Sequence, residues 1–311
     1  MSDIVVSIVC NTFNQEKYIR SAMDGFLMQK TKFPIEILVH DDASTDGTAE
    51  IVNEYASKHP DIVKPILQIE NQYSKQVAIS EKFQFSRARG KYIAFCEGDD
   101  YWTDPLKLQK QVDAMEQHPE LDICSHQMET ERDGKKTGVV PSENQNKVFS
   151  VDEVIAGGGG FVSTASLMFR RDLFLHPYNF QQMMSLDYIW QMAGSLRGGM
   201  LYLNDCMGVY RQKAKGSWTA TAEKYPYAQI EAWKRISIVL DVLNEETEHQ
   251  HSEAISQQIA MMQLNPWIRL GDLKKVFSAE GRRLLRLQTI KQQMMIPLFT
   301  LRRWLIRKFR T

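Results

Sequence analysis

The sequence has few cysteines and no long apolar run, and each absence excludes a class of protein. Its 311 residues include four cysteines, which form neither a CxxC pair nor a zinc-binding spacing. We therefore expect buried free thiols in a reducing compartment, without a disulfide framework or a zinc site. No apolar stretch reaches the roughly 18 residues of a membrane-spanning helix, and no secretory signal is recognisable at the N-terminus. These absences predict a cytoplasmic protein.

Glycine-rich phosphate loops and a net charge are missing as well. The turn after the first predicted strand reads Asn-Thr-Phe-Asn, and neither a Gly-x-Gly-x-x-Gly fingerprint nor a Walker A sequence is present. The formal net charge is zero, so no overall field favours nucleic acid as a partner. A bound phosphate would therefore need another partner, and a metal ion is the natural one.

What the sequence does contain is an alternation of buried strands and amphipathic helices. Continuous β-branched and apolar runs predict strands, and apolar residues at helical spacing predict the helices between them. The predicted strands span residues 4–10, 35–40, 63–69 and 92–96, and the predicted helices span residues 16–29, 49–57 and 78–89. This order predicts an α/β fold with a mostly parallel, doubly wound sheet.

A cluster of carboxylates, Glu97, Asp99 and Asp100, follows the strand at residues 92–96. Ligands of open α/β sheets bind at the carboxyl ends of the strands. Crowded carboxylates repel one another unless a cation neutralises them, and Mg²⁺ or Mn²⁺ prefers such oxygen ligands. The alternative is that the Asp-Asp pair only makes a turn before a helix, with Asp104 as its N-cap and Pro105 in its first turn.

A second acidic turn begins with Asp41 and Asp42, directly after the strand at residues 35–40. One of these carboxylates can accept a hydrogen bond from a base or a ribose. The alternative is an Asx-turn and helix cap. Asp46 or Ser44 can take the capping role, which would leave Asp41 and Asp42 for a ligand.

Three segments in this order, residues 6–14, 40–48 and 97–102, resemble family 2 glycosyltransferases of the GT-A fold. The pattern Asp-Asp-x-Ser-x-Asp-Gly-Thr in the second segment is the most specific part of the resemblance. The likeness is strongest to enzymes that build capsules and surface polysaccharides, and it covers residues 4–220. It implies a transferase domain at residues 1–220, with a donor-nucleotide half at 1–120 and an acceptor half at 121–220.

The resemblance also implies a chemistry and a set of residues. It implies a nucleotide-sugar donor, with UDP as the expected nucleotide, a divalent metal ion (Mg²⁺ or Mn²⁺), a saccharide or lipid-linked acceptor, and inversion at the anomeric carbon. Thr12 and Asn14 match the turn that lines the nucleotide pocket. Asp42, with Asp41 beside it, matches the carboxylate that contacts the base. Asp100 matches the metal ligand, and Asp99 a ribose contact or a second metal contact.

The acceptor half carries the expected catalytic base. Asp187 matches the Asp of the family's Glu-Asp motif, although Leu186 replaces the usual Glu. Asp187 could instead cap the helix that follows it. The four glycines at residues 157–160 resemble the border of the acceptor site, and a flexible linker is the alternative. Arg211, with Lys213 or Lys215, would neutralise diphosphate charge unless these residues form a solvated basic loop.

The last third of the chain, residues 221–311, is predicted to be helical. Helices are expected at residues 228–243, 253–264 and 268–295, and Pro297 is expected to interrupt the last one. Nine basic residues and no acidic residue follow Glu280. The segment 298–310 is therefore a basic amphipathic helix that either contacts the cytoplasmic face of a membrane or packs on protein. A homo-oligomer also stays open.

Two other functions remain open at this stage. A sugar-nucleotide uridylyl- or cytidylyltransferase would share the sheet and the metal, but should carry a glycine-rich basic loop after the first strand. A non-catalytic protein that binds nucleotide sugars would not need Asp187.

Overall fold

The computed structural model describes residues 3–212, 214 and 228–309. The chain divides into two compact units. The sheet unit comprises Met1–Val154 and Gly159–Ala220, and the helical unit comprises Ile155–Gly158 and Thr221–Thr311. The division thus falls after Ala220, near the predicted boundary, with one short segment assigned to the other unit. Each unit is described by itself.

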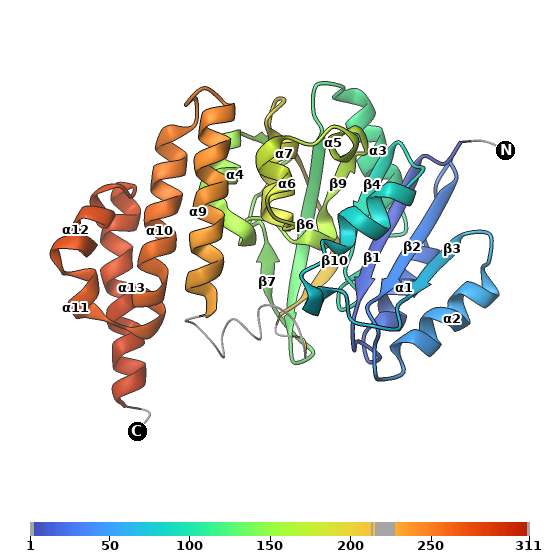
Figure 1. Ribbon diagram of the computed structural model, residues 1–311, viewed down its shortest axis with the longest axis horizontal. Helices are drawn as coiled ribbons and strands as arrows, with labels where there is room; N and C mark the ends of the chain where they lie inside the picture. The colour runs from blue at the N-terminus through green and yellow to red at the C-terminus, as the bar shows by residue number, and fades with distance from the viewer. Residues whose placement is uncertain (1–2, 213, 215–227, 310–311) are drawn as a thin grey trace. The chain divides into compact units, whose positions relative to one another are not determined.

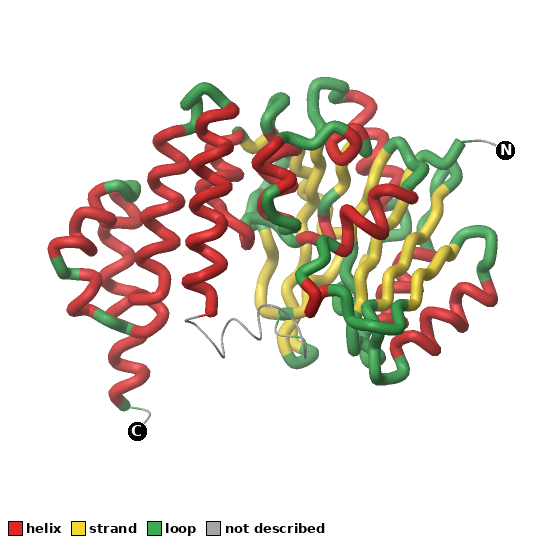
Figure 2. The backbone as a smooth tube through the Cα atoms, in the orientation of Figure 1, coloured by secondary structure: helices red, strands yellow, loops and turns green. Residues whose placement is uncertain are grey.

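The described strands of the sheet unit form one ten-stranded sheet that is flanked by helices (Figures 1 and 2). The strands are β1 (Val6–Thr12), β2 (Ile35–Asp41), β3 (Val63–Leu67), β4 (Tyr92–Phe95), β5 (Tyr101–Trp102), β6 (Ile123–Arg132), β7 (Lys135–Val140), β8 (Lys147–Phe149), β9 (Met168–Arg170) and β10 (Met200–Arg211). Their order is β3-β2-β1-β4-β9-β6-β10-β5, with β7 paired to β6 and β8 paired to β10. The predicted α/β fold is confirmed.

Parallel pairing brings the predicted motifs to one edge. β1 pairs in parallel with both β2 and β4, and β2 pairs in parallel with β3. The antiparallel strand β9 separates this group from the parallel pair β6 and β10. The carboxyl ends of β1, β2 and β4 therefore meet at the same edge of the sheet.

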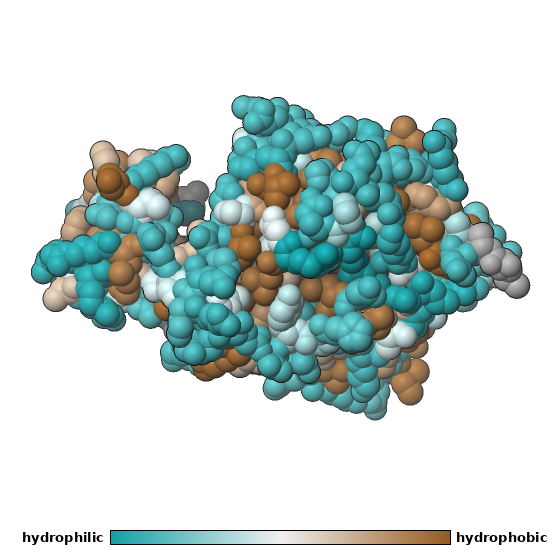
Figure 3. Space-filling view, turned by 90° about the horizontal axis from the view of Figure 1, so that it is seen from above, coloured by the Kyte–Doolittle hydropathy of each residue, from teal (hydrophilic) through white to brown (hydrophobic). Residues whose placement is uncertain are grey.

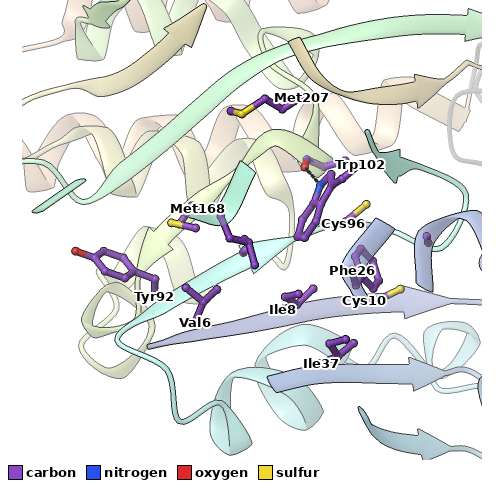
Figure 4. Close-up of a cluster of buried hydrophobic side chains, with 14 of the residues drawn as sticks. Val6, Ile8, Cys10, Phe26, Ile37, Tyr92, Cys96, Trp102, Met168 and Met207 are labelled. Atoms are coloured by element: carbon purple, nitrogen blue, oxygen red, sulfur yellow. Dashed lines mark hydrogen bonds between the residues drawn. The ribbon is translucent and has the colours of Figure 1, made fainter. Parts of the chain in front are cut away.

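The strands of the sheet unit are apolar because both faces of the sheet are covered. Ile8, Ile37 and Phe26 are among the fully buried side chains that pack around them (Figure 4). Trp102 lies in this core too, and its indole Nε1–H donates to the carbonyl of Ala165 at 2.8 Å. That bond satisfies the polar atom that burial of a tryptophan otherwise leaves unpaired.

The edge strand β3 carries Pro65 on its outer side. Ile37 N–H donates to Ile62 O at 2.9 Å, and Gln68 N–H donates to Asp41 O at 3.0 Å. Because successive residues of a strand point alternately to either neighbour, the even-numbered residues of β3 face β2. Pro65 therefore faces away from β2, where it offers no N–H.

The described helices of the sheet unit outnumber the predicted ones, and their ends differ from the predicted ends. Those described are α1 (Ile19–Leu27), α2 (Thr48–Lys58), α3 (Lys107–Gln117), α4 (Val151–Gly157, shared with the helical unit), α5 (Asp172–Leu175), α6 (Asn179–Gln182) and α7 (Asp187–Ser195). The expected start at Asp104 is wrong. Its carboxylate accepts from Leu106 N–H at 2.8 Å, so Asp104 closes a turn before α3.

Two further expectations in the sheet unit need correction. Residues 78–89 do not form a regular α-helix but a π-helical turn, η2 (Ser80–Gln84), and a 3₁₀ turn, η3 (Phe85–Arg87). The glycines are no extended linker, because Gly157 ends α4 and Gly158–Gly160 form the 3₁₀ turn η4. Two more 3₁₀ turns are η1 (Tyr73–Lys75) and η5 (Thr164–Ser166).

The expectation that all four cysteines are buried is wrong for one of them. Cys206 is exposed, whereas Cys10, Cys96 and Cys124 are buried.

The helical unit contains more helices than predicted. They are α9 (Ala228–Glu246), α10 (Ser252–Leu270), α11 (Leu273–Val276), α12 (Ala279–Arg286) and α13 (Ile290–Lys308). The expected single helix at 268–295 is wrong, because Asp272, Ser278 and Thr289 each accept a backbone N–H at the start of a new helix. Pro297 lies inside α13 and does not interrupt it.

A small core holds the helical unit together. Ile296 of α13 packs with Leu264 of α10 and with Leu284 and Leu285 of α12. None of the helices in the described part of the chain is long and apolar enough to cross a membrane.

Candidate active site

Two turns lie next to each other at the carboxyl edge of the sheet. We call the turn at the end of β1, which includes Thr12 and Asn14, the donor turn, and residues 97–100 after β4 the acidic turn. Thr12 ends β1 and pairs in register with Asp41, which ends β2. β4 ends at Phe95, and the acidic turn follows it directly. Gly98 N–H donates to the carbonyl of Asn11 at 3.1 Å, which ties the acidic turn to β1.

A glycine is needed at position 98 because the acidic turn lies very close to the donor turn there. A Cβ at Gly98 would lie 2.5 Å from Oε1 of Gln15 and 2.7 Å from Oγ1 of Thr12. These two side chains are themselves joined, because Thr12 Oγ1 donates to Gln15 Oε1 at 2.8 Å. Any larger residue would push the donor turn away from the acidic turn.

The acidic turn concentrates negative charge in a buried place. Asp100 is 1% exposed and Asp99 is 8% exposed. Burial, followed by the charges of Asp99 and Glu97, raises the pKa of Asp100 well above its usual range. The Glu97 side chain reaches solvent but is crowded by protein. This desolvation, with the charges of Asp99 and Asp187, raises its pKa to about 8. An opposing charge close to these carboxyls would favour their ionised forms.

Arg211, the last residue of β10, holds the acidic turn in place. Its backbone N–H donates to Oδ1 of Asp100 at 2.7 Å, and its guanidinium donates to the carbonyl of Asp99 at 2.8 Å. The guanidinium also lies 4.2 Å from the ring of Tyr101 and 3.6 Å from a carboxylate oxygen of Glu131. The neighbouring Lys213 and Lys215 lie outside the described residues.

Asp41 and Asp42 are bonded to their own protein, contrary to the expectation that they are left for a ligand. Ser44 N–H donates to Asp41 at 3.0 Å, and the Ser44 hydroxyl donates to it at 2.5 Å. Asp42 accepts from Gln72 N–H at 2.7 Å and from Tyr73 N–H at 3.0 Å. A ligand at Asp42 must therefore share its carboxylate with the loop that follows β3.

Asp46 does not take the expected N-cap position, which belongs to Gly47. The Asp46 carboxylate accepts from Thr48 N–H at 3.0 Å and closes the turn before α2. Asn14 joins the same turn to β1, with its side-chain oxygen accepting from Thr45 N–H at 2.8 Å. Asn14 has a φ of 53°, a left-handed conformation that asparagine tolerates better than most residues.

Asp187 is the first residue of α7, and Leu186 takes the N-cap position without a side-chain cap. Asp187 therefore does not act as the predicted alternative N-cap. Its Oδ2 accepts from the Thr164 hydroxyl at 2.6 Å, and its Oδ1 accepts from Tyr188 N–H at 2.7 Å. Burial raises the pKa of Asp187, and these bonds oppose the shift. An oriented carboxylate of raised basicity is suited to accept a proton.

Trp190 of α7 packs on Phe95, the last residue of β4, with 5.0 Å between the ring centroids. The helix that begins with the expected base therefore lies beside the strand that leads into the acidic turn. Sequence reasoning missed three partners in this region, namely Gln15, Thr164 and Glu81. Thr164 follows the glycine segment that was linked to the acceptor site, which was the available signal for it. Nothing in the local sequence marks Glu81.

No group of three or more His, Cys, Asp or Glu side chains is arranged to hold a metal ion within residues 3–212, 214 and 228–309. Any metal at the acidic turn would take further ligands from the substrate, which is the usual arrangement for Mg²⁺ bound with phosphates.

The model of the family described as "Glycosyl transferase family 2" matches residues 7–176. The chain belongs to glycosyl transferase family 2. The match covers β1, β2, β4 and the acidic turn, and it ends before Asp187. Family membership makes the protein a glycosyltransferase, and it decides against the nucleotidyltransferase that the sequence had left open.

Among the relatives of this glycosyltransferase is an uncharacterised protein of Mycobacterium tuberculosis, Rv1520. The two are 34% identical over 305 residues, which are 96% of this chain and 84% of the relative. A shorter similarity, 35% identity over 112 residues, links 36% of the chain with 41% of WfaP of Escherichia coli. WfaP is described as a UDP-Glc:alpha-D-GlcNAc-diphosphoundecaprenol beta-1,3-glucosyltransferase.

Solved structures share the GT-A fold of this glycosyltransferase. Residues 1–349 of TarS from Staphylococcus aureus, in complex with UDP-GlcNAc, superpose with a TM-score of 0.62 at 17% identity, covering 96% of this chain and 88% of TarS. The mannosyltransferase PcManGT of Pyrobaculum calidifontis, in complex with GDP-Man and Mn²⁺, superposes with a TM-score of 0.55 at 15% identity, covering 97% and 88%.

Proposed function

We propose that this glycosyltransferase moves a sugar from a UDP-sugar to a saccharide or lipid-linked acceptor, with inversion, in the synthesis of a surface polysaccharide. The observation that carries the proposal is a pair of contacts at one sheet edge. Gly98 N–H of the acidic turn donates to the carbonyl of Asn11, next to Thr12. Trp190 of the Asp187 helix packs on Phe95 at the end of β4. The UDP-GlcNAc complex of TarS supports a UDP-sugar donor. The described activity of WfaP supports a diphosphate-lipid acceptor.

A divalent ion, Mg²⁺ or Mn²⁺, fits the donor set of the acidic turn. Asp100 and Asp99 are buried, and mutual repulsion in the cluster raises the pKa of Asp100. A cation would relieve this repulsion. It would supply Lewis-acid stabilisation of the charge on the leaving diphosphate. The Mn²⁺ complex of PcManGT supports the same assignment.

The chain's own residues would orient the reactants and move one proton. Asp187 accepts the proton of the acceptor hydroxyl while the hydroxyl oxygen bonds to the anomeric carbon. The bond from that carbon to the diphosphate breaks at the same time, and the nucleoside diphosphate leaves with the electron pair. Attack opposite the leaving group inverts the anomeric configuration.

The other residues that the family resemblance assigns to the donor site would hold the donor. Thr12 and Asn14 would line the nucleotide pocket, and Asp42, beside Asp41, would contact the base. Asp99 would contact the ribose or the metal. For Arg211 we propose an indirect part in donor binding, because its hydrogen bonds to Asp99 and Asp100 fix the acidic turn.

Ligand-dependent melting tests the donor site. UDP, UDP-sugars and GDP-sugars are screened with and without Mn²⁺ or Mg²⁺. A ligand that binds only the folded state at about 100 times its Kd stabilises by about 2.7 kcal/mol. We expect metal-dependent stabilisation by a UDP-sugar that is lost in Asp100→Asn. Glu54→Gln, on the exposed face of α2, serves as the control. Absence of a response to every nucleotide from a folded protein would refute the proposal.

We also propose that residues 298–310 contact the cytoplasmic face of a membrane. Leu298, Phe299 and Leu305 of α13 and Phe309, which follows it, are exposed, and basic residues lie between them. In the space-filling view, apolar and polar side chains lie side by side over the helical unit (Figure 3). A second copy of this face would bring like charges together, whereas anionic lipid would neutralise them. A lipid-linked acceptor would be presented at the same surface.

A further inference from the structure

We propose that Glu81, on the π-helical turn η2, is a positioning residue that holds the Asp187 helix against the donor edge of the sheet. The proposal rests on the role given above to Asp187. Glu81 touches no atom that would react, so its effect on catalysis is exerted through α7.

Both carboxylate oxygens of Glu81 are bound to residues on either side of Asp187. The hydroxyl of Ser185 donates to one oxygen at 2.6 Å, and the indole Nε1–H of Trp190 donates to the other at 3.1 Å. A single side chain thereby fixes the residue two positions before Asp187 and the residue three positions after it. Hydrogen bonds to a charged acceptor are the stronger kind.

The π-helical turn η2 is also hydrogen-bonded to the donor edge, which is the edge of the sheet formed by the carboxyl ends of β1 and β2. Asn11 Nδ2–H donates to the hydroxyl of Ser80 at 2.9 Å. The side-chain amide of Gln84 donates to the carbonyls of Cys10 at 3.0 Å and Leu38 at 3.2 Å. Because Thr12 follows Asn11 directly, η2 connects the end of β1 with the start of α7.

Trp190 extends this connection to the acidic turn. Its ring centroid lies 5.0 Å from that of Phe95, the last residue of β4, and 5.4 Å from that of Phe85 in η3. Trp190 is 5% exposed. The bond from its Nε1–H to Glu81 therefore orients a buried ring. That ring packs on Phe95, which precedes Glu97 of the acidic turn by two positions.

The π-helical geometry is itself unusual. Phe85 N–H donates to the carbonyl of Ser80, five residues earlier, at the end of η2. Such turns are rare and occur often at functional sites. Here the turn presents Ser80 and Gln84 to the donor edge while Glu81 reaches α7.

Hydrogen exchange tests whether Glu81 holds α7 in place, without a measurement of activity. In Glu81→Ala, we expect the amides of residues 187–190 to exchange faster than in the wild type. In Glu81→Gln, the amide oxygen can still accept from Trp190 Nε1–H, and the amide N–H can donate to the Ser185 hydroxyl oxygen, so exchange should stay near the wild-type rate. Glu54→Ala is the matched control, because Glu54 also joins two side chains, Arg20 and Lys58, but on the exposed face of α2. Unchanged exchange at residues 187–190 in Glu81→Ala would overturn the proposal.

Steady-state kinetics test the consequence for transfer. A displacement of about 1 Å at a reacting group can cost on the order of 100-fold in rate. We expect Glu81→Ala to lower kcat about 10- to 100-fold with the KM for donor little changed, and Glu81→Gln to recover most of kcat. Ser185→Ala and Trp190→Phe should add little to the loss in Glu81→Ala.

The outcomes separate this inference from the proposed function. Equal kcat values for the wild type and Glu81→Ala would overturn the positioning role and leave the transferase intact. A wild type without transfer to any acceptor would instead count against the proposed function. The exchange rates of residues 187–190 would still show whether Glu81 holds α7 in place. A shifted pH profile in Glu81→Gln would mean that Glu81 exchanges protons itself, which also contradicts a positioning role.

Discussion

Asp187 is subject to two opposing influences on its proton affinity. Burial raises its pKa, while the Thr164 hydroxyl and the Tyr188 N–H stabilise the ionised form. The start of α7 adds the favourable end of a helix dipole. The net effect raises the pKa of Asp187, so this carboxylate is more basic than an exposed aspartate.

Replacing this carboxylate should separate chemistry from donor binding. In Asp187→Asn, we expect kcat to fall about 10²- to 10⁴-fold, the usual range for a general base. The thermal shift caused by donor and metal should persist. Thr164→Val, which removes one hydrogen bond to the base, should give a smaller loss. Full transfer by Asp187→Asn would show that another group accepts the proton.

The upward shift in the pKa of Asp187 predicts how kcat/KM depends on pH along the acidic limb of the pH profile. Asp187 must be ionised to accept a proton, and its pKa lies above the ordinary value of 3.8. The kcat/KM of the wild type should therefore decrease as the pH falls through that raised pKa. In Thr164→Val the limb should move to higher pH, because one bond to the ionised form is lost. An unmoved limb would contradict the assignment.

Lys107 is a residue whose burial carries a cost. It is 0% exposed, its Nζ has no hydrogen-bond partner among the described residues, and the Nζ lies 3.6 Å from the ring centroid of Trp102. Burial lowers its pKa to about 7, against 10.5 for an exposed lysine. Between these two pH values the unfolded chain binds a proton that the folded chain does not. The stability of the fold should therefore decrease as the pH falls from 10.5 to 7.

Lys107→Met should remove this cost. We expect the variant to be more stable at pH 7 by about 1–4 kcal/mol, the range seen when buried charges are replaced by apolar side chains. Its stability should also change less between pH 7 and 10. Urea unfolding at both pH values measures this, with exposed Lys17→Met as the control. A destabilised variant with an unchanged pH dependence would show that the amine contributes favourably.

At the scale of elements, α7 lies unusually close to the sheet. A Cβ at Gly194 would lie 2.8 Å from Cβ of Ile123 in β6, an atom fixed to the backbone. Gly194→Ala must therefore move α7 away from β6, and Asp187 would move with it. Overpacking costs about 1–3 kcal/mol, and the gain in helix propensity offsets up to about 1 kcal/mol of it.

We accordingly expect Gly194→Ala to lower kcat at least tenfold while reducing the unfolding free energy by less than about 2 kcal/mol. Kinetics and urea unfolding on the same preparation distinguish the two effects. Gly47→Ala is the control, since a Cβ there would meet only the flexible side chain of Glu16, at 3.3 Å. An active, stable Gly194→Ala would mean that α7 can shift without consequence.

The elements also explain what the sequence could predict. The position of Thr12, Asp41 and Asp100 at one sheet edge could be predicted because each lies at or just after the end of a buried apolar run, and strand and turn signals are local. Glu81 was missed because its partners, Ser185 and Trp190, lie more than 100 positions away. The helix expected at residues 268–295 failed because its apolar spacing continues across Ser278 and Thr289, and the caps at these residues were overlooked.

The whole molecule is neutral, but its charge is unevenly distributed along the chain. Because nine basic residues follow Glu280 without an acidic one, the end of the helical unit should be drawn to anionic surfaces. Each basic residue near such a surface contributes about 1 kcal/mol, and salt weakens the attraction.

Vesicle sedimentation checks this expectation. The protein should bind vesicles that contain phosphatidylglycerol, bind phosphatidylcholine vesicles weakly, and dissociate as NaCl is added. Arg302→Glu with Arg303→Glu should weaken binding more than tenfold, since two charges are reversed. Lys234→Glu with Arg235→Glu, on exposed positions of α9, is the matched control. Equal binding by both double variants would contradict a contact through residues 298–310.

The proline on the outer side of β3 has a consequence for how molecules of this protein meet one another. The rim of an open sheet can recruit a further strand from another molecule, which is a common beginning of aggregation. At the middle of β3, Pro65 has no N–H for the carbonyl of an incoming strand. A continuous ladder cannot form across that position, so growth of the sheet from one molecule into the next is discouraged.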